Sequence, residues 1–228
     1  MAFDPTDMQD WIRSDHYHNR FLIPPDDALS SALNLSEQNK LPAYAVSEAQ
    51  GKFLNLLVKS IQARRILEIG TLGGYSTIWL AKALPVDGEI LTCEISDEFA
   101  KIAQKNIDNA GLTNKVKILV GPAVTLLPSI HPDASFDLAF IDADKQSNVE
   151  YFVQAKRLVR NGGIIIVDNV VRNGRVADPE QSDASIEGVR RLLEYIQNDS
   201  TVEATTLATV GEKGYDGFLY AINKPSTN

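Results

Sequence analysis

Apolar residues recur along this chain in two alternating patterns. Short apolar runs bounded by turn residues predict buried strands, and they occupy residues 66–69, 89–94, 115–120, 136–141 and 163–167. Between them, apolar residues spaced three or four apart predict helices that pack on those strands. Strands that alternate with helices at this interval form βαβ units. We therefore predict an α/β fold with a doubly wound, mostly parallel sheet and helices on both of its faces.

The pattern changes in the last part of the chain. A helix predicted over residues 184–197 is followed by two segments with strand-like composition, residues 201–207 and 217–222. A glycine-bearing loop joins them, without the helix that a parallel connection would need. This predicts an antiparallel C-terminal hairpin at the edge of the sheet, where a six-stranded dinucleotide-binding fold would have another parallel strand.

The first predicted strand ends in a turn with three glycines, Gly70, Gly73 and Gly74. Nucleotide-like cofactors bind at such strand-turn-helix junctions. The fingerprint for NAD requires a glycine two residues before Gly70, and this chain has Glu68 there instead. Because a carboxylate favours a cationic sulfonium and ammonium, the turn favours S-adenosylmethionine (SAM) over NAD. Glu94, at the end of the second strand, is placed to accept hydrogen bonds from ribose hydroxyls.

Each of these polar residues also has a structural interpretation. Glu68 could pair with a buried cation, and Glu94 could serve as an anion at the start of the next helix. Ser76 could contact the cofactor or cap the helix that follows the turn.

The segment before the first strand contains aromatic residues that a free tail would not need, among them Trp11, Tyr17 and Tyr44. We predict that residues 1–45 form a helical extension that covers the cofactor side or a partner subunit, and that residues 46–228 form the main domain. At residues 47–50 the sequence Ser-Glu-Ala-Gln predicts a capping box, in which Ser47 accepts a backbone amide and Gln50 reaches back.

Composition excludes several function classes. The 228-residue chain has a net charge of −8, which argues against nucleic-acid binding, and its small basic cluster, Lys156, Arg157 and Arg160, is typical of a solvated face. No long apolar run or leader pattern is present, so we expect a cytoplasmic protein without membrane attachment. The single cysteine, Cys93, lies in a predicted strand and is expected to be a core residue.

The fourth and fifth strands end in polar residues, Asp142 in one case and Asp168 with Asn169 in the other. Ligands of parallel sheets bind at the carboxyl ends of strands, so these oxygens should converge on a hard cation such as Mg²⁺ or Ca²⁺. A turn pair and a capping residue are the alternative interpretation. Lys145 follows within reach, and an ammonium beside a divalent cation is disfavoured, so Lys145 is a candidate base. It could instead be a surface lysine that offsets Asp142 and Asp144.

Several segments taken together resemble the cation-dependent class I O-methyltransferases, the group of the catechol and caffeoyl-coenzyme A O-methyltransferases. The resemblance extends from about Val46 to Ile222 and is carried by residues 46–54, 68–76, 121–123, 141–145 and 168–174. It implies a Rossmann-like fold in which residues 46–228 form a SAM-dependent methyltransferase domain. It also implies a homodimer.

The resemblance implies a role for each matching residue. Asp142, Asp168 and Asn169 would hold the divalent cation, most simply Mg²⁺ although Ca²⁺ or Mn²⁺ is compatible, Lys145 would be the catalytic base, and Asn173 would touch the substrate. The residues implied for SAM binding are Val46, Glu68, Gly70, Thr71, Gly74, Ser76, Glu94, Ala123 and Asp142. The implied reaction is in-line displacement, in which an aromatic oxyanion attacks the sulfonium methyl group.

The acceptor is expected to be a small aromatic with vicinal hydroxyls, of catechol, flavonoid or hydroxycinnamoyl type. Asp144 occupies the place of an aromatic residue in the animal catechol enzymes, which makes the motif similar to the plant caffeoyl-coenzyme A and bacterial branch. Residues 1–45 are not basic enough to predict binding of a coenzyme A phosphate, so a free catechol is the preferred substrate. Two alternatives are a tRNA hydroxyuridine O-methyltransferase and a non-catalytic, cofactor-binding homodimer.

Overall fold

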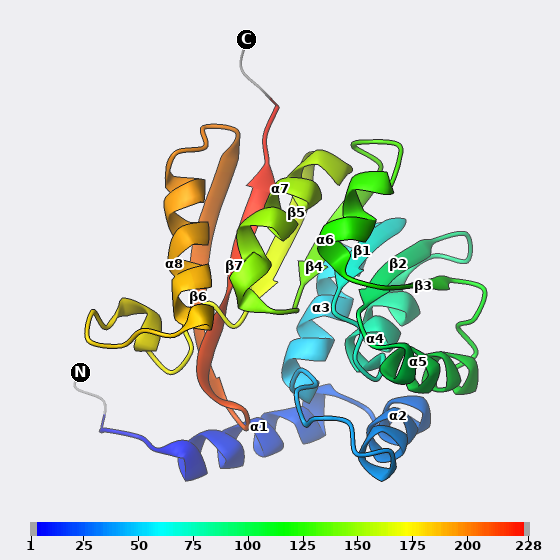
Figure 1. The fold of residues 1–228 in the computed structure, drawn as a ribbon. Coiled ribbons are helices and arrows are strands. Elements are labelled where there is room, and N and C mark those ends of the chain that lie inside the picture. The colour runs from blue at the N-terminus through cyan, green and yellow to red at the C-terminus, as the bar shows by residue number, and fades with distance from the viewer. Residues whose placement is uncertain (1–3, 226–228) are drawn as a thin grey trace.

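The computed structural model of the protein describes residues 4–225 and confirms the predicted fold class. Residues 1–3 and 226–228, at the outer ends of the two predicted domains, lie outside the described residues. Seven strands form one sheet in the order β3-β2-β1-β4-β5-β7-β6 (Figure 1). Their bounds are β1 Arg65–Ile69, β2 Glu89–Glu94, β3 Val116–Val120, β4 Phe136–Ile141, β5 Val159–Asp168, β6 Val202–Gly211 and β7 Gly214–Asn223.

The first five strands pair in parallel, and β7 pairs antiparallel with both β5 and β6. Because β1 and β4 are neighbours while β2 and β3 lie on the other side of β1, the strand order reverses beside β1. Ligands of doubly wound sheets bind at that reversal, outside the carboxyl ends of the strands. The topology therefore places the candidate site beyond the ends of β1, β2, β4 and β5.

Helices cover both faces of the sheet because alternate side chains of each strand point to opposite faces. On one face Ile66 of β1 and Phe140 of β4 pack with residues of α3 (Glu48–Ser60), α4 (Tyr75–Ala83) and α5 (Asp97–Asn109). On the other face Leu67 and Ala139 pack with residues that follow β3, in α6 (Ala123–Leu126), and with α7 (Asn148–Leu158) and α8 (Ala184–Gln197). Each strand of the central sheet is therefore buried on two sides.

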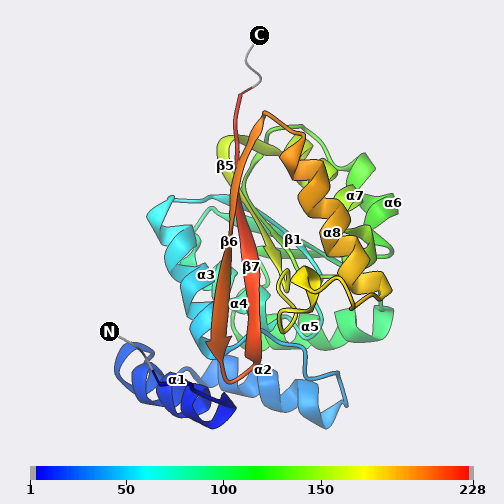
Figure 2. The same cartoon turned by 90° about the vertical axis from the view of Figure 1, so that its left-hand side faces the viewer.

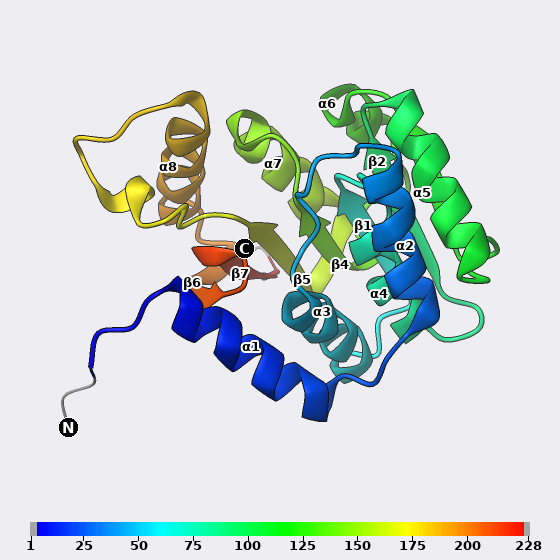
Figure 3. The same ribbon diagram turned by 90° about the horizontal axis from the view of Figure 1, so that it is seen from below.

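The N-terminal segment contains two helices, α1 (Met8–Leu22) and α2 (Asp27–Gln38), which lie across the lower end of the molecule in Figure 1 and are seen from below in Figure 3. Their starts are set by local capping, since the carboxylates of Asp7 and Asp26 accept amides of the first turns. Asn106 on α5 donates to the carbonyl oxygens of Ala32 at 3.2 Å and Gly73 at 2.8 Å. The extension is therefore anchored to α5 and close to the glycine turn.

The C-terminal hairpin is confirmed, but it is longer than predicted. Strands β6 and β7 continue to a two-residue turn, Glu212 and Lys213, where the sequence had predicted a loop. Gly214 has φ of +93°, which a side chain would disfavour, and the Glu212 amide donates to Asp15 of α1 at 2.8 Å. Because this support comes from a helix some 200 residues away in sequence, no local pattern reveals it. Figure 2 shows the hairpin reaching down to α1.

Three other sequence predictions can be checked in the fold. Among residues 4–225, no helix combines the length and the apolar character needed to span a membrane. Cys93 is buried in the sheet, and burial raises the pKa of its thiol to about 12, as suits a core residue. The basic cluster is neutralised locally, because Lys156, Arg157 and Arg160 each pair with an aspartate.

Candidate functional site

A cavity of about 1900 Å³ lies at the carboxyl ends of the parallel strands. Its wall combines the turn after β1, the ends of β2, β4 and β5, parts of α1 and α2, and the tip of the β6–β7 hairpin. Sites for one small molecule usually measure about 300–1000 Å³, so this cavity has room for two ligands side by side. Eleven of the predicted site residues line it: Val46, Gly70, Thr71, Ser76, Glu94, Ala123, Asp142, Lys145, Asp168, Asn169 and Asn173.

The glycine turn brings the end of β1 against the end of β4. Gly70 has φ of +102°, and a Cβ built there would lie 2.1 Å from the carbonyl oxygen of Asp142. No side chain fits in that space, so Gly70 serves both the backbone conformation and the close approach of the two strands. Gly74, predicted to contact the cofactor, is the N-cap of α4 with φ of +80° and does not line the cavity, whereas Gly73 does.

Glu68, which the resemblance implied for the SAM site, is buried behind the cavity wall and does not line it. Its fully buried carboxylate accepts hydrogen bonds from Ser76 Oγ at 2.7 Å, Thr77 Oγ1 at 2.5 Å and Thr92 Oγ1 at 2.7 Å. Burial raises the pKa of Glu68 to about 7. The three hydroxyls replace the cation that was the alternative partner, and Ser76, which does line the cavity, is oriented through Glu68.

Glu94 ends β2 at the cavity and is held by two backbone amides. One carboxylate oxygen accepts from Leu72 at 2.8 Å and the other from Ser96 at 2.9 Å. Ser96 itself caps α5, accepting the amide of Phe99 at 3.3 Å, so the helix does not depend on Glu94 for its cap. Glu94 is therefore a fixed anion in the wall, between the glycine turn and the next helix.

The ends of β4 and β5 bring Asp142, Lys145 and Asp168 together. Lys145 is only 6% exposed, and its Nζ donates to Asp142 Oδ1 at 2.8 Å. Asp168 is buried, and burial, followed by the negative charge of Asp142, raises the pKa of Asp168 to about 7. Asn169 follows in a left-handed conformation, with φ of +57°. The interpretation of Lys145 as a solvated surface lysine is therefore wrong.

Two carboxylates and one ammonium leave this part of the cavity with surplus negative charge, and the repulsion between Asp142 and Asp168 is visible in the raised pKa of Asp168. A divalent cation would relieve it, and two carboxylates with an amide oxygen suit Mg²⁺. Among the described residues, no group of three His, Cys, Asp or Glu side chains is placed to bind a metal. The predicted ligand set has only two carboxylates, Asp142 and Asp168, and its third member is Asn169. These oxygen donors fit Mg²⁺.

Gln50 is a site residue that the sequence analysis assigned to another role. Ser47 does cap α3 and accepts the Gln50 amide at 3.1 Å, as predicted. The Gln50 side chain, however, lines the cavity beside Asp168 and lowers the pKa of that carboxyl against the effect of burial. Only the fold brings α3 beside the end of β5, so the local capping motif gave no sign of this contact.

Asp216 on β7 was also missed, and it organises the loop after β5. Its Oδ1 accepts three backbone amides, those of Val171 at 3.1 Å, Arg172 at 2.7 Å and Gly217 at 2.9 Å. The Asn173 amide donates to the Tyr215 carbonyl at 2.8 Å. The predicted substrate residue Asn173 is therefore placed by the hairpin, a long-range contact without a local sequence signal.

Asp144, next to Lys145, has a structural role. Its carboxylate accepts the Ser147 amide at 3.2 Å and hydroxyl at 2.7 Å, and it also accepts the Tyr151 hydroxyl. Burial and the Asp144 carboxylate raise the pKa of Tyr151. Asp144 thereby caps the short helix η2 (Lys145–Ser147) and fixes the backbone at Lys145.

The chain is similar to known O-methyltransferases. A family model described as O-methyltransferase matches residues 26–218. A catechol O-methyltransferase from Niastella koreensis is 47% identical over 212 residues, covering 92% of this chain and 96% of its own length. A crystal structure of an O-methyltransferase from Bacillus cereus in complex with SAH has a TM-score of 0.93 and 47% identity, covering 96% of this chain and 100% of that one.

A third comparison extends the same result. The O-methyltransferase TomG from Streptomyces achromogenes, involved in tomaymycin synthesis and solved in complex with SAM, has a TM-score of 0.92 and 45% identity, covering 97% of this chain and 100% of that one. The resemblance seen in the sequence motifs is thus confirmed over nearly the whole chain. Because one family model spans most of its length and these relatives match it end to end, the chain belongs to the O-methyltransferase family.

Proposed function

We propose that this protein transfers the methyl group of SAM to one hydroxyl of a small vicinal-dihydroxy aromatic, with the help of a divalent cation, most simply Mg²⁺. The observation that carries the proposal is the contact between Lys145 Nζ and Asp142 Oδ1, 2.8 Å long, in the cavity that also contains the glycine turn. A binding protein would need the turn, but it would not need a buried lysine beside two carboxylates.

The cofactor would lie along the ends of β1 and β2. The SAM-bound and SAH-bound relatives support this choice of cofactor. Glu94 is held by two amides and is a fixed acceptor for ribose hydroxyls. Next to it, Ile95 lines the cavity with 72% of its surface exposed, and Ala123 lies in the same wall, so a flat adenine ring would cover apolar surface there.

The acceptor would lie between the glycine turn and the end of β5. Asp142, Asp168 and Asn169 would hold the cation, whose positive charge favours loss of a proton from a neighbouring hydroxyl. Lys145 would first lose its ammonium proton to solvent and then, as the neutral amine, accept the hydroxyl proton at Nζ, while Asp142 orients the amine. The acceptor oxygen then attacks the methyl carbon as the carbon–sulfur bond breaks, leaving SAH. The fixed geometry of the wall positions the two reactants for this displacement.

The catechol name of the Niastella koreensis relative supports a vicinal diol as the acceptor. The division into a helical extension, residues 1–45, and a methyltransferase domain, residues 46–228, is also part of the proposal. Helices α1 and α2 supply cavity residues such as Met8 and Ser36, so the extension would shape the site without carrying its chemistry.

The test combines a variant with metal removal. Methyl transfer from labelled SAM to catechol, with Mg²⁺ present, is expected to fall about 10²–10⁴-fold in kcat for Lys145→Ala, while SAM binding measured by calorimetry stays close to wild type. Lys101→Ala, which removes a surface lysine paired with Asp97, is the matched control and should keep its turnover. A chelator should abolish turnover, and added Mg²⁺ should restore it. Activity that survives both Lys145→Ala and the chelator would contradict the proposal.

A further inference from the structure

Arg172 is a cation in the cavity wall without a carboxylate partner. Its Nε is buried and has no hydrogen-bond partner, and among residues 4–225 its guanidinium forms no ion pair. A desolvated donor left unpaired costs free energy. The neighbouring cation in the wall, Arg175, differs, because its Nη2 pairs with Asp183 at 2.8 Å.

The backbone at Arg172 is held in an uncommon conformation. Its φ is +53°, in the left-handed region that a long side chain rarely adopts. Asp216 Oδ1 fixes the Arg172 amide at 2.7 Å, and the next residue, Asn173, is bound to β7 through the Tyr215 carbonyl. Two long-range contacts therefore impose this conformation, and strain of this kind is concentrated where a side chain must be aimed at a ligand.

The position of Arg172 follows from the order of the strands. Along the carboxyl edge of the sheet, Glu94 ends β2, Gly70 follows β1, Asp142 follows β4 and Asp168 ends β5. Arg172 comes after Asp168 and is tied to β7, so it lies on the opposite side of the reacting groups from Glu94. A group bound by Arg172 therefore belongs to the acceptor and not to the ribose end of the cofactor.

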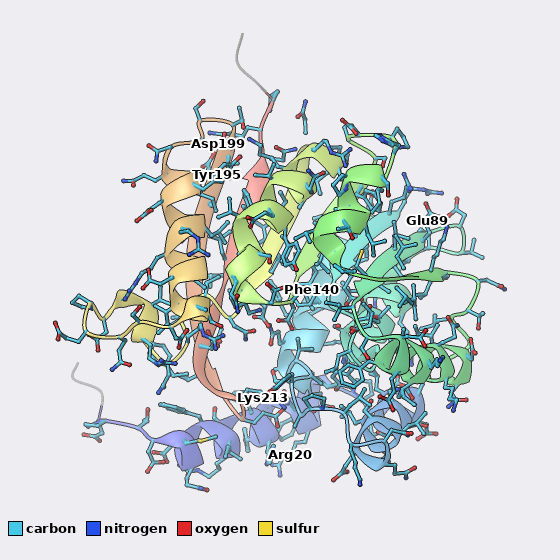
Figure 4. All side chains as sticks on the ribbon, in the orientation of Figure 1. Arg20, Glu89, Phe140, Tyr195, Asp199 and Lys213 are labelled. Atoms are coloured by element: carbon cyan, nitrogen blue, oxygen red, sulfur yellow. The ribbon has the colours of Figure 1, made fainter. Side chains whose placement is uncertain are left out.

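A second cation without a carboxylate partner lies at this end of the cavity. Lys213 lies at the turn of the hairpin (Figure 4). It also lines the cavity and has no ion-pair partner among the described residues. The nearby carboxylates of Asp216 and Asp15 accept backbone amides, and neither forms an ion pair with Arg172 or Lys213 among the described residues. The acceptor end therefore presents two free cations.

We propose that the physiological acceptor is an aromatic diol that also carries a carboxylate on its ring or side chain, and that Arg172 binds this carboxylate. The planar guanidinium matches a carboxylate in geometry and charge, and binding would compensate the unpaired cation. The proposal rests on the proposed function, because it assigns the diol end of the acceptor to Asp142, Lys145 and Asp168. Arg172 is then a specificity-determining residue that distinguishes acidic from neutral diols.

The experiment compares 3,4-dihydroxybenzoate with its uncharged analogue 3,4-dihydroxybenzamide. Binding of each to the protein loaded with SAH and Mg²⁺ is measured by calorimetry, and kcat/KM is measured with SAM. Wild type is expected to prefer the carboxylate roughly tenfold or more. Arg172→Gln should lose this preference through KM while binding SAH and the amide as wild type does. Arg172→Lys should retain part of the preference, because the positive charge stays but the planar, two-pronged guanidinium is lost.

Arg175→Gln is the matched control, since it removes a cation from the same wall that already has a partner, and it should keep the preference. Equal affinity of wild type for the two ligands, or no binding of either, would overturn the proposal. It would also be overturned if Arg172→Gln weakened both ligands equally, or if Arg175→Gln lost the preference as well. The binding measurement is independent of turnover, so a preference without methyl transfer would contradict only the proposed function.

Discussion

Gly70 meets two demands that no other residue type could meet together. Its φ of +102° and its separation of 2.1 Å, measured from a constructed Cβ to the Asp142 carbonyl oxygen, both exclude a side chain. Gly111, which follows the C-cap residue of α5, has φ of +68° but nothing within 4 Å of a constructed Cβ. Comparing substitutions at Gly70 and Gly111 therefore separates the cost of the backbone conformation from the cost of steric overlap.

We expect Gly111→Ala to lower the free energy of unfolding by about 1–2 kcal/mol, the cost of placing a side chain in the left-handed region. Gly70→Ala should lose clearly more, because the ends of β1 and β4 must also move apart, and it should weaken SAM binding. Urea unfolding and calorimetry measure the two effects. Equal stability of the two variants would show that the close contact at Gly70 relaxes without cost.

Glu68 makes the stability of the protein depend on pH. Its pKa is about 7 in the fold, raised mainly by burial, and near the ordinary value of 4.5 in the unfolded chain. Between these values the unfolded chain releases a proton that the folded protein keeps, so this residue lowers stability as the pH rises from 4.5 to 7. Below 4.5 and above 7 its contribution stays constant.

Glu68→Gln should therefore remove that part of the pH dependence. The difference in free energy of unfolding between this variant and wild type is expected to change in favour of the variant from pH 4.5 to 7 and then to level off. Glu98→Gln, at the exposed start of α5, is the control with the same change in charge. If both variants follow the wild-type pH profile, then Glu68 does not titrate as its burial indicates.

At the scale of elements, the long hairpin depends on α1 for its position. The Glu212 amide donates to Asp15 at 2.8 Å, and His16 lies 3.7 Å from the Glu212 carboxylate. The hairpin tip in turn supplies Lys213 and Tyr215 to the cavity wall. The N-terminal extension and the C-terminal hairpin therefore line the same end of the cavity, although they are far apart along the chain.

Asp15→Ala should loosen this closure. We expect faster amide hydrogen exchange over residues 208–216, a loss of roughly 1 kcal/mol in local stability, and a higher KM for the acceptor with little change in SAM binding. Asp27→Ala on the neighbouring helix α2 removes the same charge from an exposed position and serves as the control. Unchanged exchange at the tip in Asp15→Ala would show that other contacts of α1 hold the hairpin.

At the scale of the whole molecule, α1 leaves a strip of apolar surface uncovered. Tyr17, Phe21 and Leu22 are each more than half exposed, and Leu207 and Val210 on the edge strand β6 are about half exposed. An uncovered apolar patch and an open sheet edge are typical of protein interfaces. These features support the predicted homodimer.

Light scattering is expected to give a particle of about twice 25.0 kDa. Placing charges on the strip, as in Phe21→Glu with Leu22→Lys, should convert it to a particle near 25.0 kDa without unfolding it, since both side chains are mostly exposed. As a control, Val86→Glu places a charge on an exposed apolar residue in the turn between α4 and β2, and it should leave the mass unchanged. A wild-type mass near 25.0 kDa would contradict the homodimer prediction.

The distribution of charge over the whole molecule bears on the alternative of a tRNA substrate. The net charge is −8, and the basic cluster Lys156, Arg157 and Arg160 is paired with aspartates. Binding of a phosphate backbone draws on clustered cations that are free to release counterions. The unpaired cations at the acceptor end, Arg172 and Lys213, are suited to one small anion.

The sequence by itself determined the parts of this protein that depend on local pattern. The strand β4, the helix α8 and the cap Ser47 could be located because apolar spacing and capping residues act over a few positions. The motif residues Gly70, Glu94 and Lys145 could be placed in the cavity wall for a similar reason, since each lies at or shortly after the end of a strand.

Only the tertiary structure decided which side chains contact one another. Glu68 and Gln50 each have partners other than those expected. The Glu68 carboxylate accepts three hydroxyls, and the Gln50 side chain lies beside Asp168. The length of the hairpin and the placement of Arg172 depend on Asp15 and Asp216, which are distant in sequence. Burial and charge act through space, so residues that are far apart along the chain set the site, and only the folded chain brings them together.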